Sequence, residues 1–417
     1  MAALAPDLLP LLPAHLGRQR WYGAKHRSDV EVRVIMREEL RPPWPALERV
    51  VVETGGERYQ LLLGMRPASH TGSAVVDTAA VGLLQTRRGA VVCYDALADP
   101  DLGLVLLHII APDQQATTVR SIGVEQSNSS LVYDDRLILK VFRRLSGPNP
   151  EIEITLALAA QGFGGIAEPL AVWRRGGDDL ALLQRFLAGA VDGWTLALAS
   201  IAEGTDFVHE AERLGVVTAE LHLALADAFG TQPADPAGWA DTAISRLATV
   251  THANIDVAAV AATIDRIRGA TDAGQAIRIH GDYHLGQVIR SGDSWYVLDF
   301  EGEPSRPLAE RTKPSSPLRD IAGLVRSLSY AAAMGARETD PERAAQWELS
   351  TRTALLDAYV ERLQGSPILP TDGAVTASLL AAFELDKAVY EVGYEQAHRP
   401  GWVEIPLAAV SRLVLAK

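Results

Sequence analysis

The stretch HGDYHLGQVIRSGDSWYVLDFEGEP, residues 280–304, places a polar loop ahead of two short, largely apolar segments with the pattern of paired strands. Asp282 and Gln287 stand five positions apart on the loop, and Asp299 follows the second strand. A positioned carboxylate can orient an attacking hydroxyl and take its proton, while carboxylate and amide oxygens suit a magnesium ion on phosphates. This stretch therefore predicts a phosphoryl-transfer site in which Asp282 is the catalytic base and Gln287 and Asp299 bind magnesium.

Two other interpretations of this loop stay open. Its polar residues could be turn residues that cap two strands. His280, Asp282 and His284 could instead hold zinc, although zinc hydrolases usually carry more histidine or cysteine elsewhere in the chain. An aspartate, an amide five residues later and a second aspartate after a strand pair are together typical of protein-kinase-like phosphotransferases. The combined pattern favours phosphoryl transfer.

Lys140 lies in the middle of the apolar segment LILKVF, residues 137–142. An ammonium group on an apolar strand is costly unless it is paired, and Glu153, on the helix predicted to follow, is the expected partner. A lysine–glutamate pair of this kind holds the lysine against ATP phosphates. The alternative is a lysine on an edge strand that points to solvent.

A polar run, EQSNSS at residues 125–130, precedes the Lys140 strand. Its amides and hydroxyls could cover phosphates as a glycine-rich loop does. The candidate ATP-binding residues of this run are Gln126, Ser127, Asn128 and Ser129. Most runs of this kind are ordinary turns, so the nucleotide role rests on the position of the run ahead of Lys140.

The composition describes a folded chain that is too long for one hydrophobic core. With 417 residues, two or three structural units are expected. The net charge of −13 argues against a nucleic-acid partner or an anionic membrane surface, because both need a basic patch. Cys93 is the single cysteine, so no intrachain disulfide can form. The sequence shows neither a secretory signal nor a membrane-spanning run, and we expect a cytoplasmic protein.

The segment patterns predict an α+β protein with two lobes and an extra N-terminal unit. Residues 1–90 alternate apolar and polar residues in short runs and form the expected β-rich cap subdomain. Residues 91–187 predict an N-lobe, a nucleotide-binding sheet with one helix that begins near Pro150, although 104–111 could be a helix or a buried strand. Residues 188–417 repeat apolar residues at helical spacing and predict a helical C-lobe that carries the catalytic loop.

The C-terminal region carries polar and aromatic residues in steps of three or four. They are Glu384, Lys387, Glu391, Tyr394 and His398. This spacing places them on one face of a helix, where they could bind sugar hydroxyls with the ring of Tyr394 or Trp402 against the sugar. The alternative is an exposed helix face with salt bridges, which is the more common reason for such a stripe.

Several motifs together resemble the maltokinases, a group within the aminoglycoside-phosphotransferase-like kinase superfamily. They occur in the family's order over nearly the whole chain: RQRWYGAKHR at 18–27, EQSNSS, LILKVFRRL, GPNPEIEI, HGDYHLGQV, LDFEGEPSRPLAER, PLRDIAGLVRS, ELDKAVYEVGYE and HRPGW. Of these, FEGEP, ELDKAVYE and RPGW are specific to the maltokinases. The resemblance implies a two-lobed protein-kinase-like fold with an N-terminal cap. It also implies that ATP and maltose give ADP and maltose 1-phosphate, within α-glucan and trehalose metabolism.

The resemblance also implies roles for individual residues. For catalysis and magnesium these are Asp282, Gln287 and Asp299. For ATP they are the phosphate-anchoring pair Lys140 and Glu153, and the hinge residues Gln184 and Phe186 beside adenine. For the sugar they are His284, Lys387, Glu391, Tyr394 and Trp402. A monomer is the favoured state, with association with trehalose synthase as an expected partnership.

The chain departs from the maltokinase pattern near its end. Gln396-Ala397 stands where a residue followed by arginine is expected, and Glu404 is unusual between Trp402 and Pro406. An added carboxylate could suit an amine, so a glucosamine, other amino-sugar or aminoglycoside kinase is the alternative within the same reaction class. A pseudokinase that acts as a binding module is a third hypothesis, against which the intact lysine, base and metal ligands argue.

Overall fold

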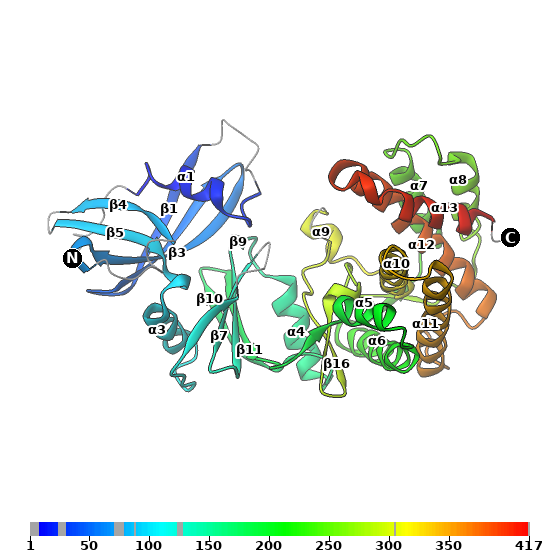
Figure 1. The fold of residues 1–417 in the computed structure, drawn as a ribbon, viewed down its shortest axis with the longest axis horizontal. Helices are drawn as coiled ribbons and strands as arrows, with labels where there is room; N and C mark the ends of the chain where they lie inside the picture. Colours follow the sequence, from blue (N-terminus) through cyan, green and yellow to red (C-terminus); the bar gives the residue numbers. More distant parts are fainter. Residues whose placement is uncertain are drawn as a thin grey trace. The chain divides into compact units, whose positions relative to one another are not determined.

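The computed structural model describes residues 8–23, 31–70, 79–86, 89–122, 128–303 and 306–415. The chain forms two compact units, drawn in Figure 1. Unit 1 consists of Met1–Ile152 and Ala167–Ala188, and unit 2 consists of Glu153–Ile166 and Gly189–Lys417. Helix α4, Pro150–Ala160, therefore begins in unit 1 and continues in unit 2. The expected division of the first unit into a cap and an N-lobe at residue 90 stays a prediction.

The larger sheet of unit 1 is antiparallel, with the strand order β1-β2-β3-β5-β4 and the short β9 on β3. The strands are β1 Val32–Arg41, β2 Ala46–Thr54, β3 Glu57–Pro67, β4 Ala80–Thr86, β5 Gly89–Asp95 and β9 Arg144–Leu145. Gly55 and Gly56 join β2 to β3 with φ values of 62° and 82°, as a two-residue hairpin turn requires. Helix α1, Leu12–Arg18, adds Leu12 and Leu16 to the core of this sheet.

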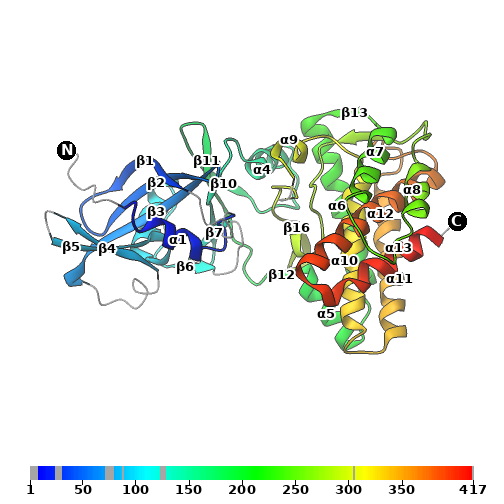
Figure 2. The same cartoon turned by 90° about the horizontal axis from the view of Figure 1, so that it is seen from above.

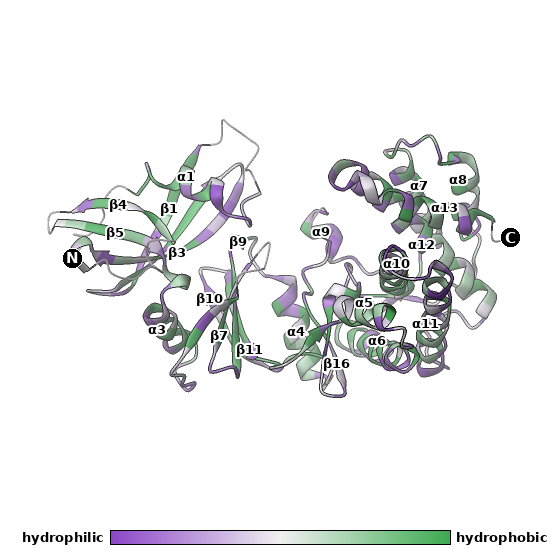
Figure 3. Ribbon diagram, viewed as in Figure 1, coloured by the Kyte–Doolittle hydropathy of each residue, from purple (hydrophilic) through white to green (hydrophobic). Residues whose placement is uncertain are grey.

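The second sheet of unit 1 has the order β10-β11-β8-β7-β6. Its strands are β6 Val119–Ile122, β7 Asn128–Tyr133, β8 Leu137–Phe142, β10 Pro169–Arg175 and β11 Asp178–Arg185. Strands of this sheet carry both hydrophobic and hydrophilic residues (Figure 3), and β7 and β11 are buried along most of their length. The strand expected at residues 137–142 is confirmed as β8.

Helix α3, Pro100–Ile110, settles the segment that the sequence left open between helix and strand. Asp99 caps it by accepting a hydrogen bond from the backbone N–H of Asp101, and Pro100 occupies the first turn, as is common at helix starts. The helix shares one hydrophobic core with both sheets. Short 3₁₀ turns, η1 Ala68–His70 and η2 Ala96–Ala98, complete unit 1.

Unit 2 is mainly helical (Figures 1 and 2). After α4 its helices are α5 Gly193–Glu203, α6 Val208–Phe229, α7 Pro236–Leu247, α8 Val257–Asp265, α9 Leu308–Arg311, α10 Leu318–Gly335, α11 Pro341–Arg362, α12 Gly373–His398 and α13 Glu404–Leu415. The strands are β12 Val191–Asp192, β15 Val288–Ser291 and β16 Ser294–Val297 in one sheet, and β13 Thr231–Pro233 with β14 Gln275–Ile277 in another. The turn η3 Leu285–Gln287 ends the loop at residues 280–287, and η4 Pro400–Trp402 precedes α13.

Helix α10 is buried on nearly every face and contacts α5, α11, α12 and α13. Because a helix that is apolar or paired all round must lie inside a fold, α10 forms the centre of unit 2. Within the described ranges, no helix is long and apolar enough to cross a membrane. The α+β class, with a β-rich N-terminal part and a helical C-terminal part, is confirmed.

Candidate functional site

A buried carboxylate fixes the loop that carries Asp282. Asp320, in the first turn of α10, accepts hydrogen bonds from the backbone N–H groups of His280 (2.8 Å) and Gly281 (2.9 Å) and contacts Nε2 of His222 at 3.2 Å. Nδ1 of His222 contacts the hydroxyl of Tyr359 at 2.8 Å. Burial raises the pKa of Asp320, but His222, His280 and the Gly281 N–H outweigh it and hold the pKa below its ordinary value.

The side chain of His280 joins the loop to the strand that precedes Asp299. Its Nε2 lies 2.8 Å from the carbonyl oxygen of Leu298, and its Nδ1 lies 3.3 Å from the backbone N–H of Asp282. These partners fit one tautomer, in which Nε2 donates and Nδ1 accepts. The expected base and the expected metal ligand are therefore held in one hydrogen-bonded framework.

A glycine lets the central helix approach this loop. A Cβ at Gly323 of α10 would come within 2.5 Å of the carbonyl oxygen of Tyr283. The hydroxyl of Tyr283 lies 3.0 Å from Oγ1 of Thr218, so both ends of this residue are fixed. The loop is thus set by backbone contacts that do not use the Asp282 carboxylate.

Lys387 of α12 is the residue that the structure brings to the expected base. Its Nζ lies 3.6 Å from Oδ1 of Asp282, and the two side chains are 27% and 22% exposed, so a ligand from solvent can reach them. Burial lowers the pKa of Lys387, but the carboxylates of Asp282, Glu391 and Glu303 outweigh it and raise the pKa above its ordinary value. Lys387 is therefore a cation beside Asp282 throughout the physiological pH range.

The expected magnesium ligands, Gln287 and Asp299, are neighbours. Nε2 of Gln287 lies 3.4 Å from Oδ2 of Asp299, and the backbone carbonyl of Gln287 accepts from the N–H of Leu298 at 2.9 Å. Asp299 has a φ of 62°, a left-handed conformation that aspartate tolerates better than most residues. An amide and a carboxylate side by side form an oxygen-rich pair that fits magnesium.

His284 has a structural contact of its own. Its Nδ1 accepts a hydrogen bond from the N–H of Gly286 at 3.0 Å and so caps η3. Burial lowers the pKa of His284; Asp282 opposes this shift and Lys387 adds to it, so the pKa stays below its ordinary value. His284 therefore lies in the electrostatic environment of Asp282 as a neutral ring, and its expected contact with the sugar stays a prediction.

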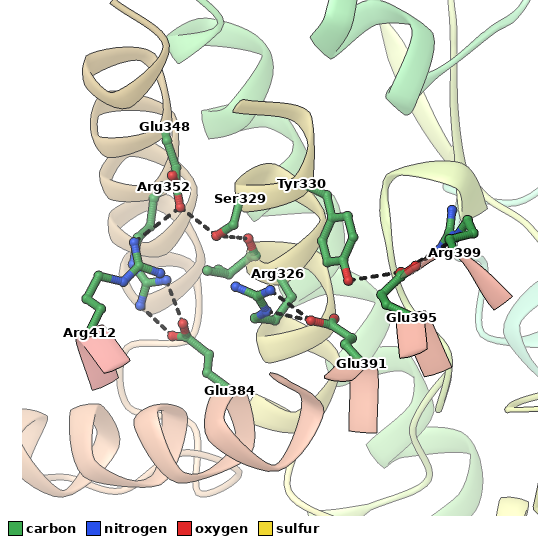
Figure 4. A network of polar contacts seen from close by, with 11 residues as sticks. Arg326, Ser329, Tyr330, Glu348, Arg352, Glu384, Glu391, Glu395, Arg399 and Arg412 are labelled. Atoms are coloured by element: carbon green, nitrogen blue, oxygen red, sulfur yellow. Dashed lines mark hydrogen bonds and ion pairs between the residues drawn. The ribbon is translucent and has the colours of Figure 1, made fainter. Parts of the chain in front are cut away.

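Two residues of the polar stripe on α12, Glu384 and Glu391, belong to a network of ion pairs shown in Figure 4. Glu384 pairs with Arg352, and Glu391 pairs with Arg326 at 2.8 Å. Glu395, which lies outside the predicted stripe, pairs with Arg399 at 2.7 Å. The side chains of Glu384 and Glu395 are 0% and 1% exposed. Glu384 is therefore buried, whereas Tyr394 and His398 are exposed, so the alternative of an exposed, salt-bridged face fits only part of the stripe.

Tyr394 and Trp402, the aromatic residues expected at the sugar, pack on other side chains. Tyr394 is 41% exposed, and its ring stacks on His398 at 4.4 Å. Trp402 lies 6.2 Å from the ring of Tyr330, and the guanidinium of Arg399 lies 4.6 Å from its centroid. Of the five expected sugar ligands, Lys387 is thus the one with a direct contact to Asp282.

In unit 1, Lys140 is paired, but with a different glutamate from the one expected. Its Nζ lies 2.7 Å from Oε2 of Glu151, and these side chains are 13% and 6% exposed. Glu153 is 52% exposed and lies 3.4 Å from Arg278. Residues two apart on a helix point to nearly opposite sides, so the expected Lys140–Glu153 pair is wrong and Glu151 takes its place.

The other expected nucleotide ligands are distributed along unit 1. Gln126 and Ser127 lie outside the described residues. Asn128 and Ser129 begin strand β7 rather than lying in a loop, and the hydroxyl of Ser129 accepts a hydrogen bond from Arg143 at 2.8 Å. The side chain of Gln184 donates to the carbonyl of Ala167 at 3.0 Å, and the ring of Phe186 lies 5.6 Å from the guanidinium of Arg120.

Asp320 is the main site residue that sequence reasoning missed. Its signal was present, because a charged residue near the start of the apolar helix at 318–335 must find a buried partner. Its partners at 222 and 280–281 are distant in the sequence, and no spacing rule names them.

We expect Asp320→Asn to lower kcat and to change KM for ATP little. The variant loses the contacts that position the 280–287 loop but keeps the expected ATP ligands of unit 1. Breaking a buried, charged hydrogen-bond pair costs about 3–5 kcal/mol, so urea unfolding should also show a large loss. The pKa of Asp320 is lower in the folded state than in the unfolded state. Its contribution to the free energy of unfolding is therefore fully present above the unfolded-state pKa and is lost as the pH falls through the folded-state pKa.

As the pH is lowered, the free energy of unfolding should therefore fall less steeply in Asp320→Asn than in the parent. Asp265→Asn, an exposed aspartate in unit 2, is the control. An Asp320→Asn variant with the parent's kcat and the parent's loss of stability at low pH would show that Asp320 does not position the loop.

The chain matches two family models and several known proteins. The phosphotransferase enzyme family matches residues 117–357, and the maltokinase N-terminal cap domain matches residues 15–99. A glucosamine kinase of Mycolicibacterium smegmatis (strain ATCC 700084 / mc(2)155) is 30% identical over 329 residues, which cover 72% of this chain and 81% of that protein. A glucosamine kinase of Streptacidiphilus jiangxiensis is 28% identical over 350 residues, covering 76% and 78%.

The fold is also found in a solved structure. A glucosamine kinase in complex with glucosamine, ADP and inorganic phosphate aligns with a TM-score of 0.71 and 22% identity, covering 99% of this chain and 100% of that one. This likeness extends the shared fold over both units. The chain therefore belongs to the phosphotransferase enzyme family and carries a maltokinase-type cap domain at residues 15–99.

Proposed function

We propose that this protein transfers the γ-phosphoryl group of ATP to a hydroxyl of glucosamine or a closely related amino sugar. The main support for this chemistry is the geometry of the loop that contains Asp282. Asp320 and His280 fix the loop, and Nζ of Lys387 lies 3.6 Å from Oδ1 of Asp282. The amino-sugar acceptor is supported by the two glucosamine kinases that share 30% and 28% identity with most of the chain. They favour glucosamine over maltose, which was the main expectation from the sequence motifs.

In this mechanism the Asp282 carboxylate orients the sugar hydroxyl and takes its proton as the phosphoryl group is transferred. Lys387 lies beside Asp282, and the carboxylates around it raise its pKa, so it remains a cation at the site. Gln287 and Asp299 would hold magnesium, which neutralises phosphate charge when bound. In unit 1, Lys140, fixed by Glu151, would bind the phosphates of ATP.

Maltose is the second candidate acceptor, and one observation favours it. The cap at residues 15–99 is of the maltokinase type, although a cap domain does not itself define the acceptor of the C-terminal unit. Association with trehalose synthase, a monomeric state and a cytoplasmic location stay predictions from the sequence.

We expect glucosamine to give a higher kcat/KM than glucose or maltose. A charge-assisted hydrogen bond to the amine contributes about 1.5–3 kcal/mol, so the advantage over glucose should be roughly ten- to a hundredfold. A coupled assay of ADP release with the three sugars measures it. Maltose as the best substrate would replace the amino-sugar proposal.

Glu404 is the side chain to test as the partner of the amine. It is exposed in the first turn of α13, so its removal should leave the fold intact. Glu404→Ala should lower kcat/KM for glucosamine towards the value for glucose, whereas Glu361→Ala, an exposed glutamate of α11, should not. An unchanged preference in Glu404→Ala would assign the amine to another group.

A further inference from the structure

A cavity of about 260 Å³ lies between helices α10, α11 and α13 of unit 2. Seven alanines contribute to its wall: Ala332, Ala333, Ala336, Ala344, Ala345, Ala408 and Ala409. Larger side chains at such helix positions would normally fill this space. The volume is just below the range of roughly 300–1,000 Å³ typical of ligand pockets, so the cavity suits a small molecule.

The cavity is open to solvent and closed at depth. Ala345 and Ala408 are exposed, whereas Ala332, Ala344 and Ala409 are buried. A ligand can therefore enter past α11 and α13 and contact buried methyl groups. Small apolar molecules can bind against such an apolar wall.

Arg326 of α10 gives the cavity a polar group. Its side chain is 1% exposed, and its Nε and Nη2 donate to Oε2 of Glu391 at 2.9 and 2.8 Å (Figure 4). Within the described part of the chain, its Nη1 is buried and has no hydrogen-bond partner. A buried N–H without an acceptor is costly, so an oxygen atom of a ligand would be stabilised here.

The charges around the cavity favour an uncharged ligand. Glu391 already pairs with the Arg326 guanidinium, and Glu384 adds a second carboxylate to its surroundings. The other charged lining residues, Glu348 and Arg412, pair with each other at 3.3 Å. These carboxylates already balance the charge of the Arg326 guanidinium, so they would repel a carboxylate ligand. A carbonyl or hydroxyl oxygen would accept a hydrogen bond from Nη1 without that repulsion.

We propose that this cavity is an effector site for a small, uncharged, largely apolar molecule that carries one acceptor oxygen. The path to the active site is short. Arg326 binds Glu391, Glu391 lies one helical turn after Lys387 and raises its pKa, and Lys387 lies 3.6 Å from Asp282. The effector role rests on Asp282 as the base of the proposed function, whereas the binding itself does not.

Alanine methyl groups report on occupancy directly. The protein is labelled with ¹³C-methyl alanine and titrated with cyclohexanone, a probe with one carbonyl and an apolar ring. We expect saturable shifts confined to the seven lining alanines, and weaker binding of cyclohexanecarboxylate. An absence of these shifts would show that the cavity holds only water, and tighter binding of the carboxylate would overturn the uncharged class.

Two filling variants and a neighbouring control separate the cavity from the rest of the surface. Ala332→Leu fills its buried end and Ala345→Leu its exposed end, so one remains informative if the other fails to fold. Gln346→Leu adds the same side chain at an exposed position of α11 that does not line the cavity. Either filling variant should abolish the methyl shifts of the remaining lining alanines, and the control should keep them.

The effector role is read from turnover with the sugar that the protein phosphorylates best. Saturating cyclohexanone should change kcat or KM several-fold in the parent and in Gln346→Leu, and leave a folded filling variant unaffected. Methyl shifts without any change in turnover would overturn the effector role. The methyl shifts require no turnover, so their loss is distinguishable from failure of the proposed sugar-kinase activity.

Discussion

Replacing Asp282 by asparagine is expected to lower kcat by about 10²–10⁴, the usual cost of losing a positioned general base. The amide has nearly the same shape as the carboxylate but cannot accept the proton of the sugar hydroxyl. The loop should keep its conformation, because Asp320 and His280 hold it through backbone atoms, including the N–H of residue 282 itself. ATP binding should also persist, since its expected ligands lie in unit 1.

Rates of ADP release, thermal unfolding and ATP affinity test this expectation together. The control is Asp293→Asn, on the turn of the same hairpin, whose side chain is 94% exposed. The control should behave as the parent does. Turnover near the parent's in Asp282→Asn would remove Asp282 from the mechanism.

Asp299→Ala is expected to abolish magnesium-dependent activity, with Gln287→Ala giving a milder loss. A carboxylate binds a hard dication more strongly than a neutral amide does, so the two variants should rank in that order. Initial rates across a magnesium titration measure both the maximum rate and the magnesium requirement.

Backbone strain is a separate consequence of changing Asp299, because its φ is 62°. Asparagine tolerates this conformation, whereas alanine does not. Asp299→Asn is therefore the matched variant: it should keep the stability of the parent and still lose activity. An Asp299→Asn variant with the parent's magnesium requirement would contradict the ligand assignment.

The sequence predicted the elements whose signal is local. The paired strands after the 280–287 loop appear as β15 and β16. Helix α4 begins at Pro150, with acidic residues in its first turn, as expected. The segment at 104–111 could not be assigned from periodicity, because a short apolar run fits both a helix and a strand; the cap at Asp99 was the missing signal.

The partners of buried charges could not be predicted in the same way. In the sequence PEIEI, two glutamates stand two positions apart, and which one faces Lys140 depends on how the helix packs on the strand. Similarly, the α12 stripe has the spacing of a ligand-binding face, yet its carboxylates, Glu384 and Glu391, pair with Arg352 and Arg326. The spacing of side chains predicts which residues share one face of a helix, but not which residues elsewhere in the chain that face contacts.

The sequence motifs and the related proteins favour different acceptor sugars. ELDKAVYE and RPGW favoured a maltokinase, whereas the relatives that cover most of the chain are glucosamine kinases. Within ELDKAVYE, Lys387 contacts the expected base, and Glu391, the last residue of the motif, pairs with Arg326. This part of the motif therefore serves the phosphoryl-transfer loop and its surroundings, which kinases of different sugars can share.

The most direct test of the central claim is ³¹P NMR of the purified protein with magnesium, ATP and glucosamine. We predict a new phosphomonoester signal that grows as the γ-phosphate signal of ATP disappears and ADP forms in equal amount. Omission of the sugar should leave ATP intact. Release of inorganic phosphate alone, or no reaction with glucosamine under conditions in which maltose is phosphorylated, would contradict the account.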